Sequence, residues 1–83
     1  MEFAEGKVLY DRALTLAEEA YGPDHPVVAT VVNNLGGVLQ DLGDLKGAKE
    51  HFERALSLFR KSLGEDHQST ATVRKNLELL ANV

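Results

Sequence analysis

A repeat within the sequence restricts what this chain can fold into more than any other feature. When the sequence is shifted by 42 residues, it aligns with itself without a gap. The segment 12–16 then falls on 54–58, and 22–25 falls on 64–67. Further on, Asn34 and Leu35 fall on Asn76 and Leu77. Two copies account for nearly all of the chain, so we expect one local structure to be built twice and stacked.

Two stretches on either side of Gly43 carry a helical pattern. Apolar residues recur there at steps of three and four, which puts each set on one face of a helix. The sets are Val28, Val31, Val32, Leu35, Val38, Leu39 and Leu42, and then Leu45, Ala48, Phe52, Ala55, Leu56, Phe59 and Leu63. Gly43 can adopt the left-handed conformation that ends a helix, and Asp44 can cap the next one. So short a connection predicts two antiparallel neighbours.

The whole chain is expected to form four helices, over residues 2–21, 25–41, 44–63 and 66–82. The segment 22–26, Gly-Pro-Asp-His-Pro, is a short loop that ends the first helix and starts the second. Asp24 or His25 would cap the second helix, and Pro26 suits its first turn. The segment 64–67 has the same loop pattern without the prolines.

Composition narrows the class of protein. Eighty-three residues predict one small domain, and the absence of cysteine excludes disulfides and thiolate sites. That absence fits a reducing compartment, so we expect a cytoplasmic protein. No apolar run approaches the roughly 18 residues of a membrane span, and the N-terminus lacks a signal-peptide layout. We therefore expect no membrane association.

The charge is mildly acidic and uneven. A net charge of -4 argues against nucleic acid as a partner. Residues 1–41 hold seven acidic and two basic side chains, giving -5, whereas residues 42–83 hold six and seven, giving +1. These charges fit solvated helix faces. The alternative is that opposite ends of two chains attract each other.

The residues around Gly43 also match a known repeat. The pattern is Val32-x2-Leu35-Gly36-x2-Leu39, followed by Ala48-x3-Phe52 and Ala55. It resembles the tetratricopeptide repeat, although Val32 and Leu39 replace the usual Trp and Tyr, and Arg60 replaces the final Pro. The usual period is about 34 residues. The longer period of this chain is similar to that of kinesin light chain-type repeats.

The resemblance implies an all-α fold of antiparallel helical hairpins stacked as a right-handed α-solenoid fragment. Each repeat has a helix A and a helix B, and the four helices would run in the order B-A-B-A. The domain is then one half repeat (1–22), one full repeat (23–64) and one half repeat (65–83). Gly36 would lie opposite Ala48, where two backbones approach closely. In the last helix Arg74 replaces Val32 and Glu78 replaces Gly36, so we expect these two to pair and to face solvent.

The resemblance further implies a groove for an extended peptide, lined by the A helices. The implied groove residues are Thr30, Asn33, Asn34, Gly37, Gln40, Asp41, Thr72, Lys75, Asn76 and Leu79. Asn34 and Asn76 occupy the same repeat position, and an amide can both donate to and accept from a peptide backbone. The alternative is a polar residue inherited through duplication. Lys75 would supply half of the basic clamp of chaperone-binding relatives. The glycine at position 37 either lets a ligand or partner chain approach closely or arose as the two repeats diverged.

Helix 2–21 raises the question of self-association. It carries an apolar stripe that would face a missing helix. The stripe consists of Phe3, Val8, Tyr10, Ala13 and Ala17. Exposed apolar patches mark interfaces, so we expect a homo-oligomer with a closed two-fold dimer preferred. A head-to-tail contact would bury Glu78 and build filaments.

Nothing in the sequence resembles a catalytic site, a phosphate-binding loop or a metal-ligand spacing, so we expect neither enzymatic activity nor a cofactor. His25 and His67 repeat, but their place at helix starts indicates capping. The predicted function is a protein–protein interaction scaffold that binds a protein or peptide. The alternatives are a self-assembling structural repeat module and an excised or engineered fragment without its own ligand.

Overall fold

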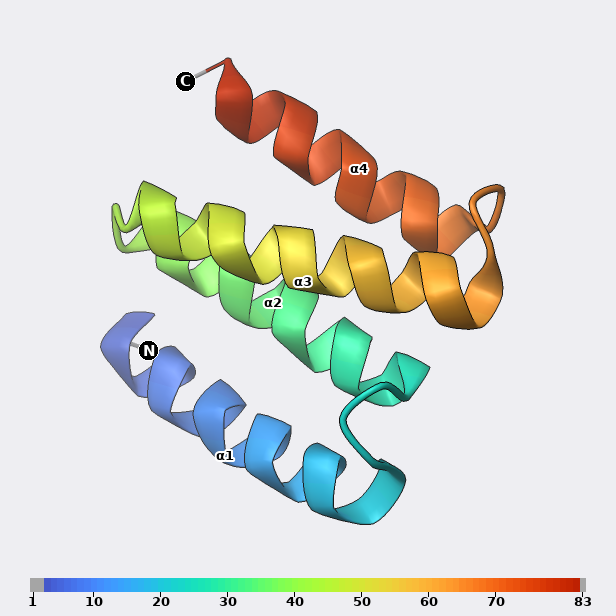
Figure 1. The fold of residues 1–83 in the computed structure, drawn as a ribbon. Coiled ribbons are helices and arrows are strands. Elements are labelled where there is room, and N and C mark those ends of the chain that lie inside the picture. The colour runs from blue at the N-terminus through green and yellow to red at the C-terminus, as the bar shows by residue number, and fades with distance from the viewer. Residues whose placement is uncertain (1–2, 83) are drawn as a thin grey trace.

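The computed structural model describes residues 3–82, and describes side chains from Lys7 to Asn82. It contains four helices in chain order: α1 (Phe3–Tyr21), α2 (Pro26–Asp41), α3 (Leu45–Leu63) and α4 (Gln68–Ala81). Figure 1 shows α1 and α4 on opposite sides of the α2–α3 pair. Each helix packs against the next one along the chain. This confirms the predicted all-α fold of hairpins packed in sequence order.

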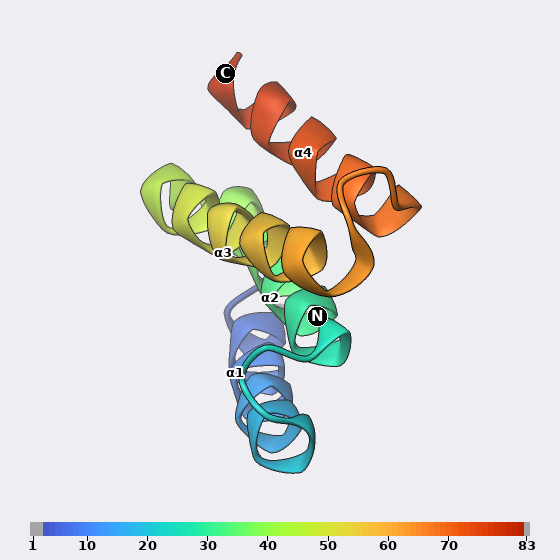
Figure 2. The same ribbon diagram turned by 45° about the vertical axis from the view of Figure 1, so that its right-hand side comes forward.

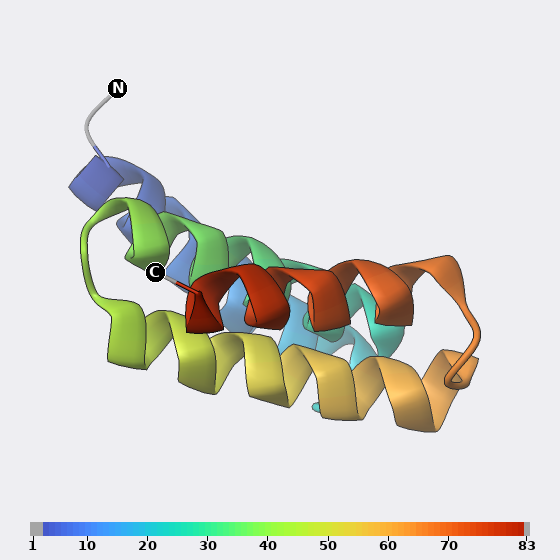
Figure 3. The same ribbon diagram turned by 90° about the horizontal axis from the view of Figure 1, so that it is seen from above.

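The helices alternate in direction, so the loops that connect them lie at two opposite ends of the molecule. The start of α1, the α2–α3 turn and the end of α4 lie at one end, and the other two loops lie at the opposite end (Figures 1 and 3). Seen from the side in Figure 2, the helices fan out rather than close into a ring. None of the described helices has the length and hydropathy needed to cross a bilayer.

The α2–α3 turn forms as its residues predict. Gly43 has a φ of 89°, in the left-handed region that favours glycine. Asp44 then caps α3, because its Oδ1 accepts a hydrogen bond of 2.9 Å from the backbone nitrogen of Gly47. The two helices are therefore held antiparallel by a very short connection.

The other two helix starts are capped by histidine. The Nδ1 of His25 accepts a hydrogen bond of 3.1 Å from the Val27 nitrogen, and that of His67 accepts one of 3.0 Å from the Ser69 nitrogen. The His25 ring also stacks on Tyr21 with centroids 4.6 Å apart. Of the two residues considered for the α2 cap, the structure selects His25, and α4 begins at Gln68, two residues later than expected.

The core lies where the apolar faces of α2 and α3 meet, with contributions from α1 and α4. Its buried members are Ala17, Val28, Ala29, Val32, Leu35, Leu39, Ala48, Phe52, Ala55, Leu58, Phe59, Val73 and Leu80. Leu42 and Leu45, predicted on these faces, flank the turn and are exposed. The buried Thr70 hydroxyl donates to the Gly64 carbonyl at 2.8 Å, so it carries no unsatisfied group into the core.

The side chain nearest to Gly36 is that of Phe52. A Cβ built at Gly36 would lie 2.7 Å from Cε1 of Phe52, so the missing side chain makes room for an aromatic ring. The sequence prediction had placed Ala48 opposite this glycine. Phe52 is only 2% exposed, and its ring fills the space between the two helices.

Arg74 does not pair with Glu78, which corrects the second expectation for the last helix. Its Nη1 instead donates to Oε1 of Glu65 at 2.8 Å, and Arg60 donates to the other carboxylate oxygen. The Arg60 hydrogen bond, reinforced by the charges of both guanidiniums, lowers the pKa of Glu65 below its ordinary value. Glu65 therefore ties the end of α3 to the side of α4 across the loop.

Candidate protein-binding face

The predicted groove residues lie together on one side of α2 and one side of α4. We call this surface the α2–α4 face. It consists of Thr30, Asn33, Asn34, Gly37, Gln40, Asp41, Thr72, Lys75, Asn76 and Leu79. On each helix they follow steps of three and four, so they share one side. The two sides meet at mid-length, where Nδ2 of Asn76 donates to Oδ1 of Asn33 at 3.1 Å.

The two asparagines that the repeat makes equivalent differ in their surroundings. Asn34 is exposed, whereas Asn76 is partly buried and holds Asn33. One side-chain amide hydrogen of Asn76 is thus already donated to Asn33. A side-chain amide has two donors and one carbonyl acceptor. Asn34 therefore offers the amide of this face that is most accessible to a ligand backbone.

The two threonines have their hydroxyl hydrogens occupied. Oγ1 of Thr30 donates to the Pro26 carbonyl at 3.1 Å, and Oγ1 of Thr72 donates to the Gln68 carbonyl at 3.0 Å. Such bonds one turn back are common for hydroxyls on helices. Both threonines are exposed and can still accept hydrogen bonds through their lone pairs.

The remainder of the face is almost neutral and has one apolar element. Asp41 and Lys75 are its only acidic and basic residues, and both are exposed. Leu79 is 56% exposed, at the position that Gly37 holds on α2. A Cβ at Gly37 would meet nothing within 4 Å, so no internal packing requires a glycine there. An almost neutral surface with amides and one leucine suits backbone hydrogen bonding and apolar contact more than charge recognition.

The stripe expected to be uncovered on α1 is mostly covered. Ala17 is 7% exposed and belongs to the core, Tyr10 packs against the core, and Ala13 is half-buried. Of the five predicted residues, Val8 is exposed at 52%, and the Phe3 side chain lies outside the described side chains. The prediction of a fully uncovered stripe is therefore wrong for Ala17 and Tyr10, because the flank of α1 that carries them packs against the core.

Sequence reasoning missed a different apolar row on α1. Leu9 and Leu16 are 58% and 65% exposed and lie beside Val8 on the outer side of the helix. The internal repeat could have indicated this row, because Leu16 corresponds to Leu58. Leu58 is only 8% exposed. The same repeat position is thus buried on α3 and open on α1.

Ion pairs connect α1 and its following loop to α3. Arg54 lies 3.5 Å from Glu18, and Lys61 lies 3.5 Å from Asp24. All four side chains are substantially exposed, so each pair contributes little stability. Among the residues that the structure describes, no three His, Asp or Glu side chains come close enough together to hold a metal ion.

A family model described as tetratricopeptide repeat matches the sequence twice, over residues 2–48 and 27–81. The chain belongs to the tetratricopeptide repeat family. The two matches together span all four helices. No curated protein matches the chain.

Membership of this family gives the coarse function. Tetratricopeptide repeats are generally protein–protein interaction modules, and the family is typically non-catalytic. The family therefore implies protein partners. Which surface of this chain binds them is a separate question, and the geometry of the α2–α4 face bears on it.

Proposed function

We propose that this chain is a protein–protein interaction module that binds an extended segment of a partner along the α2–α4 face, and that it has no catalytic activity. One observation carries the proposal. The bond between Asn33 and Asn76 joins α2 to α4, which supports one continuous surface built from matching positions of two repeats. An extended peptide can then make backbone hydrogen bonds to the exposed Asn34 amide and apolar contact with Leu79.

In this proposal α2 and α4 are A helices and α1 and α3 are B helices. Residues 1–22 and 65–83 are then half repeats around a full repeat of residues 23–64. The 42-residue spacing supports a relation to the longer repeats of kinesin light chain type. Two A helices give a short binding surface, so we expect weak affinity for a single peptide.

The experiment is a selection of peptides from a displayed random library against the full chain, followed by NMR mapping of the selected peptide. The expected result is that amide shifts change at Asn34, Gly37 and Leu79 and stay unchanged at Ser57, which is exposed on α3. Shift changes confined to α1 or α3 would contradict the proposed face.

A second candidate function, self-assembly, is favoured by the outer row of α1. Val8, Leu9 and Leu16 are each more than half exposed and lie on one side of the helix. A two-fold contact between two copies of α1 would bury this row from both chains and would close. Molecular mass by light scattering over a range of concentrations tests it. A dimer that Leu16→Glu converts to a monomer supports self-assembly, and a concentration-independent wild-type monomer contradicts it.

A further inference from the structure

The three histidines of the chain use the same ring nitrogen in opposite ways. Nδ1 of His25 and Nδ1 of His67 each accept a hydrogen bond from the backbone nitrogen two residues later. Nδ1 of His51 instead lies 2.8 Å from the carbonyl oxygen of Gly47, which can only accept. His25 and His67 therefore need an Nδ1 without a hydrogen, whereas His51 needs a hydrogen there.

The two capping bonds exist only while their imidazoles are neutral. A neutral imidazole leaves one nitrogen free to accept, whereas a protonated ring carries a hydrogen on both nitrogens. A protonated His25 or His67 would turn an N–H group toward the backbone N–H groups of its helix start. Its positive charge would also meet the positive end of the helix dipole. Protonation and capping therefore exclude each other at these two positions, while the bond of His51 survives protonation of its other nitrogen.

The charged group beside the first cap is paired elsewhere. Asp24 precedes His25 in the chain, and its carboxylate lies 3.5 Å from the ammonium of Lys61 on α3. From α1, the Tyr21 ring stacks on the imidazole of His25. The neighbours of this cap are thus an aromatic ring and a carboxylate that already has a cation.

The second cap has a similar setting at the start of α4. Asp66 precedes His67, and Glu65 is held by Arg60 of α3 and Arg74 of α4. Between Lys7 and Asn82, no carboxylate forms an ion pair with either capping imidazole. No ion pair of the fold therefore replaces a capping bond that protonation removes.

Both caps lie at the same end of the molecule, and each helix start leads directly into the core (Figures 1 and 3). Val28 and Ala29 follow His25 in the first turn of α2 and are completely buried. Thr70 follows His67 in the first turn of α4 and is also completely buried. These turns cannot loosen without disturbing the core, so loss of the caps lowers the stability of the whole fold.

We propose that His25 and His67 form a pH-sensitive switch, which holds the starts of α2 and α4 while both imidazoles are neutral and releases them in a weakly acidic medium. Histidine ordinarily gains its proton at about pH 6.5. Below this pH the unfolded chain binds protons that the folded chain binds only by losing its caps. The free energy of unfolding therefore falls as the pH falls through this range. The contribution of Glu65 is lost only below pH 4.5, so the two effects are separate.

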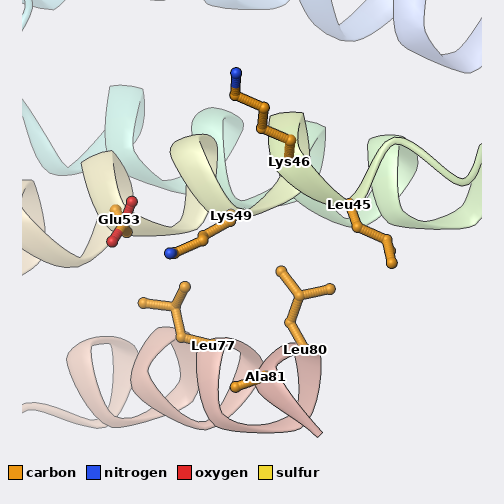
Figure 4. Close-up of a pocket in the computed structure, with 7 residues that line it drawn as sticks. All are labelled: Leu45, Lys46, Lys49, Glu53, Leu77, Leu80 and Ala81. Carbon is orange, nitrogen blue, oxygen red and sulfur yellow. The ribbon is translucent and has the colours of Figure 1, made fainter. Parts of the chain in front are cut away.

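The cavity between α3 and α4 takes no part in this switch. Its volume is about 520 Å³, and it is lined by Leu45, Lys46, Lys49, Glu53, Leu77, Leu80 and Ala81 (Figure 4). Histidine is the side chain whose charge ordinarily changes between about pH 5 and 8. None of these lining residues is a histidine, so we assign the pH dependence in that range to the helix starts.

The test is thermal unfolding of the full chain at about pH 7.5 and about pH 5.5, on either side of the ordinary histidine range. The melting temperature of the wild type should fall by about 4–8 °C for each cap that is lost at the lower pH. The double variant His25→Asn with His67→Asn should show almost no fall. Asparagine is among the best capping residues and has no proton to gain in this range.

His51→Gln is the matched control, because it removes a histidine that does not cap a helix. Its melting temperature should fall between the two pH values as much as that of the wild type. Nitrogen NMR of the imidazole rings adds a measurement that needs no variant. At about pH 7.5 it should show a bare Nδ1 in His25 and His67 and a hydrogen on Nδ1 in His51.

Several results would overturn the proposal. A wild-type melting temperature that is the same at both pH values would show that protonation does not weaken the fold. An equal fall in the double asparagine variant would place the pH dependence outside the two caps, and a fall that His51→Gln abolishes would assign it to His51. A hydrogen on Nδ1 of His25 or His67 in the neutral ring would contradict the capping bonds themselves.

Discussion

Asn76 of α4 donates a hydrogen bond of 3.1 Å to Asn33 of α2, across 43 residues of sequence. The repeat relates Asn76 to Asn34, not to Asn33. Two equivalent asparagines therefore have different environments. Asn76 joins two helices from successive repeats, whereas Asn34 stays at the surface. The bond joins the two sides of the surface that we propose binds a partner.

We expect Asn33→Ala and Asn76→Ala each to lower the free energy of unfolding by about 0.5–1.5 kcal/mol, because each removes the same partly buried hydrogen bond. The double variant should lose less than the sum of the two single losses. Urea unfolding of the four chains measures this coupling. Asn34→Ala is the matched control and should be nearly neutral, since alanine is the better helix former. Strictly additive losses would contradict a direct bond.

The pair Gly36 and Gly37 gives a second prediction, from adjacent residues of one helix. Gly37→Ala should stabilise the protein by about 0.5–1 kcal/mol, because alanine favours a helix and its Cβ meets nothing within 4 Å. Gly36→Ala should destabilise it by about 1–2 kcal/mol, because overpacking against the buried Phe52 ring outweighs that gain. Thermal unfolding of both variants measures the difference. A stabilising Gly36→Ala would show that the ring moves aside freely.

Truncation of a large core side chain should cost much more. Leu35 and Phe52 are each 2% exposed. We expect Leu35→Ala to cost about 2–5 kcal/mol and Phe52→Ala about 3–5 kcal/mol, through lost burial and a residual cavity. Either loss is a large fraction of the stability of a domain of this size. Leu79→Ala, at a leucine 56% exposed, is the control and should change thermal stability little.

The Glu65 cluster predicts a small acid-sensitive contribution to stability. Hydrogen bonding and charge from Arg60 and Arg74 lower the pKa of Glu65 from its ordinary value of 4.5. The contribution is therefore present above pH 4.5 and is lost as the pH falls through the folded-state pKa. Melting temperatures of the wild type and Glu65→Gln should converge as the medium becomes more acidic. A gap between them that is constant at every pH would contradict the pairing.

The sequence predicted the helices well because local signals decide where they begin and end. Gly43 and Asp44 form the turn that their types favour, and the apolar faces of α2 and α3 meet as their spacing requires. The use of His25 rather than Asp24 as a cap depends on side-chain geometry, including stacking on Tyr21, that no spacing rule contains.

The candidate sites were harder to predict because they depend on how helices from different repeats face each other. Leu16 and Leu58 are equivalent in sequence, yet one is exposed and the other buried, since α3 packs against both α2 and α4 whereas α1 packs mainly against α2. Arg74 was expected to pair one turn along α4 but reaches back to Glu65. The cavity between α3 and α4 is formed by residues far apart in the chain, so periodicity alone does not indicate it.

The most direct test of the proposed function is the affinity of a library-selected peptide for Asn34→Ala relative to the wild-type chain, measured by calorimetry. Ser57→Ala, at an exposed position on α3, is the matched control. Loss of one hydrogen bond to the peptide backbone should weaken binding about three- to tenfold in Asn34→Ala and leave the control unchanged. Equal affinities of all three chains would contradict binding through the α2–α4 face.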